Sequence, residues 1–353
     1  MTPMGDEVQT YQGLLNGERS LKPTPVFGRS GDEVPLSCFG SIEAALPPLW
    51  IPQLEKLLSR LPNRKWGHAG YPIVITSSNF GIGHMLAYRQ NKEVQHLDFA
   101  QAHCSVRVIR NHFGWGKDIA VLSHACVSAD IGIKYASQLL RLGNAKEVLC
   151  FSFDFLSPFV SGGFHSLKIL NGVFPSPYAD QEFGSIGLGD GIAFAVLGRE
   201  PGAFSIQFQQ TYNEMYHMTA NQPDGSGFRH ALARIKAKIK DRKIWVKGHG
   251  TGTREAGKLE AESVWEVFPE APLVGWKGGI GHTLGSCGLV ELTLAMQAMI
   301  HGMVPGTVGT TAPTLTERVM TQPFEATAFD GAILSSNAFG GAHASYLLTK
   351  EIS

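Results

Sequence analysis

Residues 118–143, DIAVLSHACVSADIGIKYASQLLRLG, place a cysteine between an expected strand and an expected helix. A short apolar run leads into small residues around Cys126, and a longer stretch with helical spacing follows. A cysteine between a strand and a helix lies at the helix N-terminus, where the helix dipole and free N–H groups favour the thiolate. We therefore expect Cys126 to be a nucleophile with a lowered pKa, although a cysteine considered alone is more often structural.

A second stretch, KGGIGHTLGSCGLVELTLAMQAMIHG (277–302), repeats this loop-to-helix arrangement with His282 in its loop. Each unit is followed by a glycine-rich turn and an apolar run, GLGDG before IAFAVLGRE and FGGAH before ASYLLTK. Such self-similarity predicts an internal duplication. We place the join near Pro201 and Gly202, which gives an N-terminal half of residues 1–201 and a C-terminal half of residues 202–353.

Short apolar runs alternate with helical patterns along the whole chain. The expected strands lie within residues 71–78, 118–125, 147–153, 191–198, 243–250, 272–278 and 332–337. A helix is predicted over residues 228–240, because its apolar side chains recur on one face: Phe228, Leu232, Ile235 and Ile239. This alternation predicts an α/β protein.

Composition excludes several classes of protein. The 353 residues are 43% hydrophobic and 17% charged, which is typical of a globular enzyme. Thirty basic and thirty acidic residues balance, so no global field favours nucleic acid or an anionic membrane. The five cysteines show no CxxC pair and no zinc-ligand spacing, which indicates free thiols and no metal site. With no signal peptide and no apolar run long enough to cross a membrane, we expect a cytoplasmic protein.

Three further side chains accompany Cys126 at the ends of expected strands. His249 stands in the glycine-rich stretch KGHGTGT, His282 follows another apolar run, and Lys277 precedes His282 by five residues. One histidine in a glycine-rich loop is weak evidence of function. One thiol, two imidazoles and an ammonium at strand ends together predict a site, because α/β sheets build their sites there.

The motifs ACVS, KGHGTGT, KGGIGHTLGSCGLVE and FGGAH, in this order, resemble those of elongating β-ketoacyl-acyl carrier protein synthases and type II polyketide ketosynthases of the thiolase superfamily. The resemblance covers most of residues 118–353. It implies a thiolase fold with five layers, αβαβα, built from two duplicated halves. It also implies an acyltransferase that joins an acyl group on Cys126 to malonyl-acyl carrier protein by decarboxylative Claisen condensation, in fatty-acid or polyketide synthesis, with polyenes among the products.

Carried over residue by residue, the resemblance assigns five catalytic residues. Cys126 accepts the acyl group, and His249 and His282 promote decarboxylation of the malonyl group. Lys277 and Glu291 hold the histidine network. No cofactor is implied, because the phosphopantetheine of the carrier protein brings the substrates.

The resemblance also assigns residues of the pantetheine channel and the gate. Thr251 and Thr253 would contact the pantetheine arm. Phe339 would be the gating residue, with its backbone N–H in an oxyanion hole beside that of the nucleophile. Asn337 and Ala338 depart from the family, which has phenylalanine and glycine there, so we expect restricted gate motion or a polar contact to an unsaturated or oxygenated chain.

The implied partners are an acyl carrier protein and a second ketosynthase-like subunit, in a homodimer or a heterodimer. Arg110, Lys117 and Arg254 are candidates for docking the acidic helix of the carrier protein. The resemblance also implies a first strand before the turn at TPMGDEV, which we expect this chain to lack. Two alternatives therefore stay open: a noncatalytic subunit that shapes the acyl tunnel of a heterodimeric synthase, and a transacylase that uses Cys126 without decarboxylation.

Overall fold

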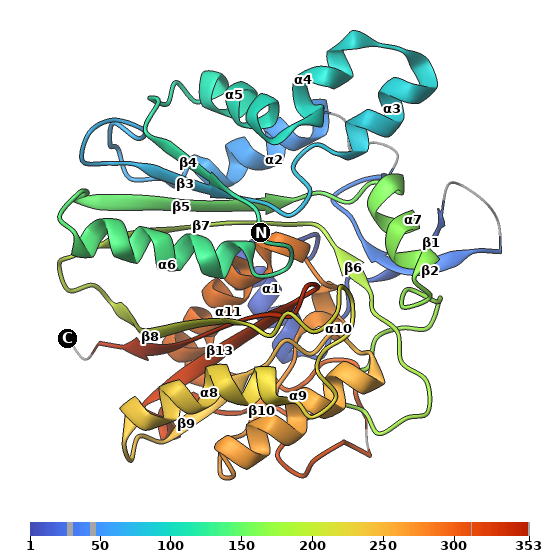
Figure 1. Ribbon diagram of the computed structural model, residues 1–353, viewed down its shortest axis with the longest axis vertical. Helices are drawn as coiled ribbons and strands as arrows, with labels where there is room; N and C mark the ends of the chain where they lie inside the picture. The colour runs from blue at the N-terminus through green and yellow to red at the C-terminus, as the bar shows by residue number, and fades with distance from the viewer. Residues whose placement is uncertain (27–30, 43–46, 312, 352–353) are drawn as a thin grey trace.

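Two β-sheets lie one above the other, with a layer of helices between them and another on each outer face (Figure 1). The computed structural model describes residues 1–26, 31–42, 47–311 and 313–351. The outer layer beside the first sheet contains α2 (Pro47–Leu58), α3 (Gly83–Asn91), α4 (Leu97–Ala100) and α5 (Ala102–His112). The middle layer contains α1 (Glu7–Leu15), α6 (Ser128–Arg141) and α11 (Cys287–His301), and the other outer layer contains α8 (Ser226–Ile239) and α9 (Arg254–Val267). The expected five-layered αβαβα arrangement is confirmed.

The two sheets repeat one strand order. The first sheet has the order β4 (Ile119–Leu122), β3 (Ile73–Thr76), β5 (Glu147–Asp154), β7 (Gly191–Gly198). The second has the order β10 (Leu273–Val274), β9 (Ile244–Lys247), β13 (Gly331–Ala338), β14 (Ala342–Lys350), β8 (Phe204–Asn213). In both sheets the first three strands are parallel, and the fourth is antiparallel to its neighbours.

Strand β8 has no counterpart in the described part of the first sheet. It lies outside β14 and pairs with it antiparallel over almost its whole length. The matching position in the first sheet is the outer edge of β7, where the backbone N and O of Met1 pair with those of Ile192.

The middle layer carries the main core, because sheets cover it on both sides. Helix α6 contributes Ala129 and Ile133, and α11 contributes Leu289, to one apolar cluster that also includes Val74 of the first sheet and Leu334 of the second. Helices buried on several faces need apolar residues all round, which explains the long apolar run in α11. Both helices begin at the loops that carry Cys126 and His282.

The remaining elements are short or peripheral. They are β1 (Lys22–Pro25), β2 (Glu33–Ser37), η3 (Val94–His96), α7 (Pro158–Ser166), β6 (Leu188–Gly189), α10 (Lys277–Ile280), η4 (Leu284–Ser286), β11 (Met303–Val304), β12 (Phe324–Glu325) and η5 (Ala326–Ala328). All seven expected strands are present, and the four apolar side chains predicted for one face of α8 are buried. None of the helices in the described residues has the length and apolarity needed to span a bilayer.

Candidate active site

Cys126 lies in a sharp turn between β4 and α6. Ala125, the residue before it, has a φ of 46°, a conformation that L-residues seldom adopt. The Ser128 hydroxyl holds this turn, since it accepts from the His124 N–H at 2.7 Å and donates to the Ala125 carbonyl at 2.6 Å. A strained turn that is held by specific bonds is typical of functional sites. The predicted position of Cys126 at a strand-to-helix turn is confirmed.

The expected lowered pKa of Cys126 is wrong for this structure. Burial raises the pKa of the thiol to about 12, because the thiolate loses its hydration. The Lys277 ammonium and the backbone N–H groups of Phe339 and Cys126 oppose this rise, and the Asp154 carboxylate adds to it. The helix position therefore does not decide the thiol pKa, because desolvation outweighs the nearby positive groups.

The two histidines face one another at the ends of different strands. Their ring centroids are 5.0 Å apart, and the rings are perpendicular. The Leu284 N–H donates to His282 Nδ1 at 3.2 Å, so the neutral ring carries its proton on Nε2. Within the described residues, His282 Nε2 and His249 Nδ1 have no hydrogen-bond partner. Burial and the Lys277 charge lower the pKa of both imidazoles well below 6.5, so both are neutral near pH 7.

Glu291 lies behind the histidines and binds two lysines. Lys277 Nζ donates to Glu291 Oε1 at 2.6 Å, and Lys247 Nζ donates to Oε2. Burial alone lowers the pKa of Lys277, but Glu291 and other neighbouring groups together raise it above its ordinary value. Lys247 was missed in the sequence, although a lysine inside the otherwise apolar run KIWVKG was a usable signal.

A second buried carboxylate, Glu260 of α9, fixes the loop that carries His249. It accepts from the backbone N–H of His249 at 2.5 Å and of Gly250 at 3.0 Å, and from the Tyr178 hydroxyl at 2.8 Å. No local pattern marks Glu260 for this role, because acidic residues are common on amphipathic helices. Only the fold shows that this one points inward.

A cavity of about 250 Å³ joins most of the predicted site residues. Its lining includes Cys126, His249, His282, Thr251, Thr253, Asn337, Ala338 and Phe339. Phe339 is partly exposed and stacks on Phe164 of α7, with ring centroids 5.7 Å apart. Lys277 and Glu291 lie outside the lining, fully buried behind the histidines.

The gate region has an ordinary strand geometry up to Ala338. This residue ends β13 and pairs with Ala342 of β14, so it needs no positive φ. The next two glycines, Gly340 and Gly341, have φ of 84° and 73°. The chain thus turns at these glycines, which explains how alanine is accommodated at position 338. The Gly340 N–H also donates to the Met218 carbonyl at 2.8 Å.

The three basic residues proposed for docking do not come together. Arg254 begins α9 beside the cavity residue Thr253, and its guanidinium lies 3.5 Å from Asp180. Arg110 lies in α5, in the opposite outer layer, and Lys117 lies between α5 and β4 (Figure 1).

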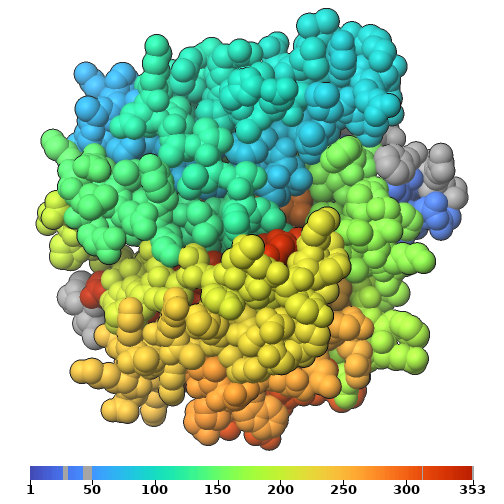
Figure 2. Space-filling model, viewed as in Figure 1, coloured from blue at the N-terminus to red at the C-terminus, as the bar shows by residue number. Residues whose placement is uncertain are grey.

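In Figure 2, C-terminal residues reach the surface between the green first half and the yellow segment of the second half.

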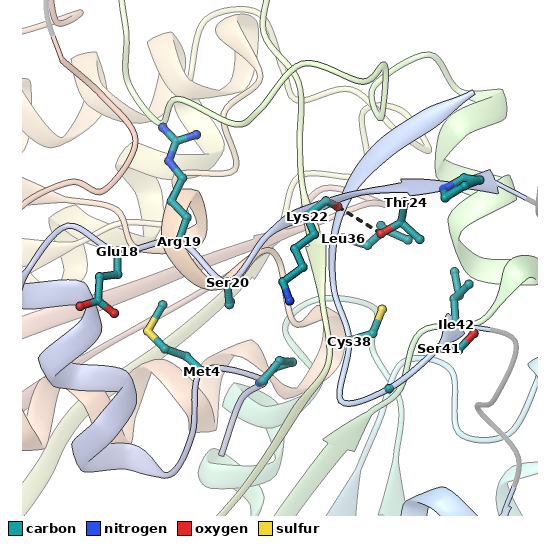
Figure 3. A pocket seen from close by; sticks show the side chains of 13 residues that line it. Met4, Glu18, Arg19, Ser20, Lys22, Thr24, Leu36, Cys38, Ser41 and Ile42 are labelled. Atoms are coloured by element: carbon teal, nitrogen blue, oxygen red, sulfur yellow. Dashed lines mark hydrogen bonds between the residues drawn. The ribbon is translucent and has the colours of Figure 1, made fainter. Parts of the chain in front are cut away.

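A separate hollow of about 550 Å³ lies among N-terminal segments (Figure 3). Its lining includes Glu18, Arg19, Lys22 and Cys38, and none of the predicted site residues. Burial, with a smaller effect from Asp190, raises the pKa of the Cys38 thiol far above its ordinary value. The lining of this hollow includes no histidine, whereas the cavity at Cys126 includes His249 and His282.

Known proteins match both the sequence and the fold. Residues 204–311 match the family Beta-ketoacyl synthase, C-terminal domain. The tetracenomycin polyketide synthase ketoacyl synthase alpha subunit of Streptomyces glaucescens is 28% identical over 216 residues, covering 55% of this chain and 51% of that protein. These matches support the resemblance to type II polyketide ketosynthases, and residues 204–311 are the part of the chain that the family model matches.

Solved ketosynthase structures share its thiolase fold. The ketosynthase ApeO, in complex with its chain length factor ApeC, from Xenorhabdus doucetiae superposes with a TM-score of 0.77 at 20% identity, covering 99% of this chain and 96% of that one. A type II polyketide ketosynthase, AntDE, in complex with the acyl-carrier protein AntF gives a TM-score of 0.82 at 17% identity, with 99% and 97% covered. Sequence alignment with the tetracenomycin subunit spans about half of that protein's length, whereas the fold agrees over nearly the whole chain.

Proposed function

We propose that this ketosynthase joins an acyl group held on Cys126 to malonyl-acyl carrier protein by decarboxylative Claisen condensation, in polyketide or fatty-acid synthesis. The observation that best supports this proposal is that Cys126, His249 and His282 line one cavity. They lie in three loops that follow strands of two different sheets. A thiol and two neutral imidazoles are the groups that this chemistry needs.

In the first step, the Cys126 sulfur attacks the thioester carbonyl of an acyl carrier protein. A new C–S bond forms at Cys126, the carrier's C–S bond breaks, and the pantetheine thiol leaves with the proton of Cys126. Because the pKa of Cys126 is raised, this proton must leave as substrate binds. The backbone N–H groups of Phe339 and Cys126 face the sulfur and would hold the oxyanion of the tetrahedral intermediate.

In the second step, the malonyl thioester loses carbon dioxide, and the electron pair of the broken C–C bond forms an enolate. N–H donors of His249 and His282 would stabilise the enolate oxygen, which lowers the barrier to carbon dioxide loss. The enolate carbon then attacks the acyl carbonyl, and the C–S bond to Cys126 breaks. The products are a longer 3-oxoacyl carrier protein and the free nucleophile. Thr251 and Thr253 line the same cavity and would contact the pantetheine arm.

Intact-mass measurement tests the first step. The protein is incubated with carrier proteins bearing a panel of saturated, unsaturated and 3-oxo acyl groups. We expect a mass increase equal to one acyl group, lost in Cys126→Ala and retained in Cys150→Ala, a matched control at a buried thiol of β5. Absence of acylation with every primer in a folded sample would contradict the proposal. The acyl group that is transferred to Cys126 most readily would indicate whether the protein elongates polyketide or fatty-acid chains.

Labelled malonyl-acyl carrier protein tests the second step and the two alternatives. We expect release of labelled carbon dioxide, with a 3-oxoacyl product, from the acylated protein. Acyl transfer without carbon dioxide release would indicate a transacylase. Activity that appears only with a second subunit and survives Cys126→Ala would indicate a noncatalytic subunit that shapes the tunnel.

A second ketosynthase-like subunit is part of the proposal, because β4 leaves an apolar sheet edge open. Among the described strands, β4 pairs on one side only, with β3, and Val121 at its centre is 39% exposed. An exposed edge of this kind favours pairing with another chain. Sedimentation velocity of the chain alone would detect a homodimer. A monomer at micromolar concentration would contradict the homodimer and leave pairing with a different ketosynthase-like chain, which co-purification of the two chains would test.

A further inference from the structure

Asn337 is a buried polar residue on the wall of the cavity, and the chemistry proposed above does not use it. It lies in β13 and pairs with His343 of β14, and 6% of its surface is exposed. It lines the cavity, and its carboxamide forms no hydrogen bond with any residue in the described part of the chain. The donors and the acceptor of this amide are therefore available to a ligand.

The other amide and hydroxyl side chains of the cavity wall already have partners. Each of them has a polar side-chain atom of another residue within 3.5 Å: Thr219 has His217, Asn221 has Glu214, and Thr251 and Thr253 have each other. Much of the remaining wall is apolar and is formed by Phe164, Ile169, Ile186, Leu259 and Phe339. Asn337 thus adds one free amide to a wall whose other amide and hydroxyl groups are engaged.

A buried amide without a partner costs free energy, because the water it loses on folding is not replaced by a protein group. The large majority of buried polar side-chain atoms in proteins have a hydrogen-bond partner, so the free amide of Asn337 needs an explanation. A bound ligand that supplies the partner removes this cost. A ligand of the same shape without a polar atom at that point leaves the cost in place, so such a site discriminates between the two ligands.

The position of Asn337 relates it to the chain that Cys126 would carry. Ala338, the next residue, packs in the same small apolar cluster as Cys126. The backbone N–H of Phe339, one residue further, faces the Cys126 sulfur. The thioester oxygen of an acyl group on Cys126 would lie at this N–H, and the following carbons of the chain would enter the cavity of about 250 Å³ that Asn337 lines.

We propose that Asn337 is a specificity-determining residue that selects acyl groups with an oxygen at carbon 3, by donating from Nδ2 to a 3-oxo oxygen. The inference rests on the proposed function, because condensation itself produces a 3-oxoacyl chain, and an unreduced product can return as the next primer. A chain that is saturated at carbon 3 offers the amide no acceptor. The residue therefore favours unreduced polyketide chains over fatty-acid chains.

Binding of unreactive analogues tests this role without any catalysis. The probes are three acyl-pantetheine amides of equal length: a 3-oxo, a 5-oxo and a fully saturated chain. The amide linkage does not transfer its acyl group to Cys126, so calorimetry measures a dissociation constant for each probe. Asn337→Leu removes the polar atoms at similar size, and Asn337→Ala is the second variant if the first does not fold. Ser345→Ala is the matched control, because it removes a buried hydroxyl of β14 that donates to Ser335 Oγ at 3.2 Å, outside the cavity lining.

We expect the wild-type protein to bind the 3-oxo probe about two- to tenfold more tightly than the saturated probe, as one uncharged hydrogen bond gives. The 5-oxo probe, which has the same polarity at another position, should gain less. Asn337→Leu should lose the preference through weaker binding of the 3-oxo probe, and Ser345→Ala should keep it. Equal binding of the 3-oxo and saturated probes to wild type, or a preference that survives in Asn337→Leu, would overturn the proposal.

Competition between primers gives the matching readout in the active protein. With 3-oxoacyl and saturated acyl carrier proteins present together, intact mass should show the 3-oxo chain on Cys126 in excess, and Asn337→Leu should lower this excess by the same factor. Acylation with no preference between the primers would contradict this inference alone. Preferential binding of the 3-oxo probe to a protein that is never acylated would contradict the proposed function alone.

Discussion

Glu260 illustrates how one buried carboxylate fixes the backbone of a site. Both of its oxygens accept backbone N–H groups of the loop that carries His249, and Tyr178 adds a third donor. These donors have no water to turn to, because Glu260 and Tyr178 are both buried. The orientation of His249 therefore depends on a residue that never faces the cavity.

Glu260→Gln should destabilise the protein and disturb the site. The amide can accept with its oxygen only, so one backbone N–H would face an NH2 group and lose its partner. We expect a loss of about 2–3 kcal/mol in the free energy of unfolding, measured in urea. Tyr178→Phe removes one donor and leaves the carboxylate, so it should cost about 1 kcal/mol. Equal losses for the two variants would refute this account of Glu260.

At the element scale, close backbone contacts join the two halves next to the site. A Cβ added at Gly285, in η4 just after His282, would lie 2.5 Å from the Ser78 backbone N and 2.9 Å from Asp154 Oδ2. Ser78 belongs to the loop after β3, and Asp154 ends β5, so η4 packs directly on the first sheet. Glycine is needed here for space rather than for conformation.

Gly285→Ala should push η4 away from the loop after β3. We expect a loss of about 2–4 kcal/mol in unfolding free energy, because backbone atoms cannot move aside as side chains do. Gly163→Ala in α7 is the matched control, since a Cβ there meets nothing within 4 Å. It should be neutral or stabilise by up to about 1 kcal/mol through helix propensity. Calorimetry would measure the melting temperature of each variant. Melting temperatures of Gly285→Ala and Gly163→Ala that shift in the same direction would disprove the packing argument.

At the scale of the whole molecule, buried acids and buried histidines give opposite pH dependences. Burial raises the pKa of Asp190 to about 7, so its contribution to stability is fully present below its ordinary value of 3.8 and is lost as pH rises towards 7. Burial lowers the pKa of His84 to about 4, so its contribution is present above 6.5 and is lost as pH falls towards 4. The contribution of Asp154 to stability falls as pH rises, like that of Asp190. The contributions of His249 and His282 rise with pH, like that of His84.

Single substitutions should therefore change the slope of the free energy of unfolding against pH between pH 4.5 and 6.5. Asp190→Asn removes a contribution to the free energy of unfolding that falls as pH rises, so the free energy of unfolding should rise more steeply with pH than in wild type. His84→Gln removes a contribution to the free energy of unfolding that rises with pH, so the slope of that free energy against pH should become more negative than in wild type. Each slope should change by up to about 1.4 kcal/mol per pH unit, measured by urea unfolding at several pH values. Slopes that tilt the same way in both variants would contradict these assignments.

Local patterns in the sequence were sufficient for part of the secondary structure and for the position of Cys126. The apolar runs predicted the strands, the spacing of Phe228, Leu232, Ile235 and Ile239 predicted α8, and the strand-to-helix position predicted the turn at Cys126. These features depend on neighbours in the chain, which is why a linear pattern reveals them. The family resemblance added the five layers and the cavity residues Thr251, Thr253 and Phe339.

Tertiary structure alone decided the electrostatics and the supporting contacts. The pKa of Cys126 is raised rather than lowered, because burial removes water that a helix N-terminus cannot replace. Glu260 and Asp154 gain their roles from partners far along the chain, and no spacing rule marks which acidic residue will point inward. The identity of each residue is read directly from the chain. The desolvation and the electrostatic interactions of a titratable group depend on everything that packs around it, and only the folded chain determines those neighbours.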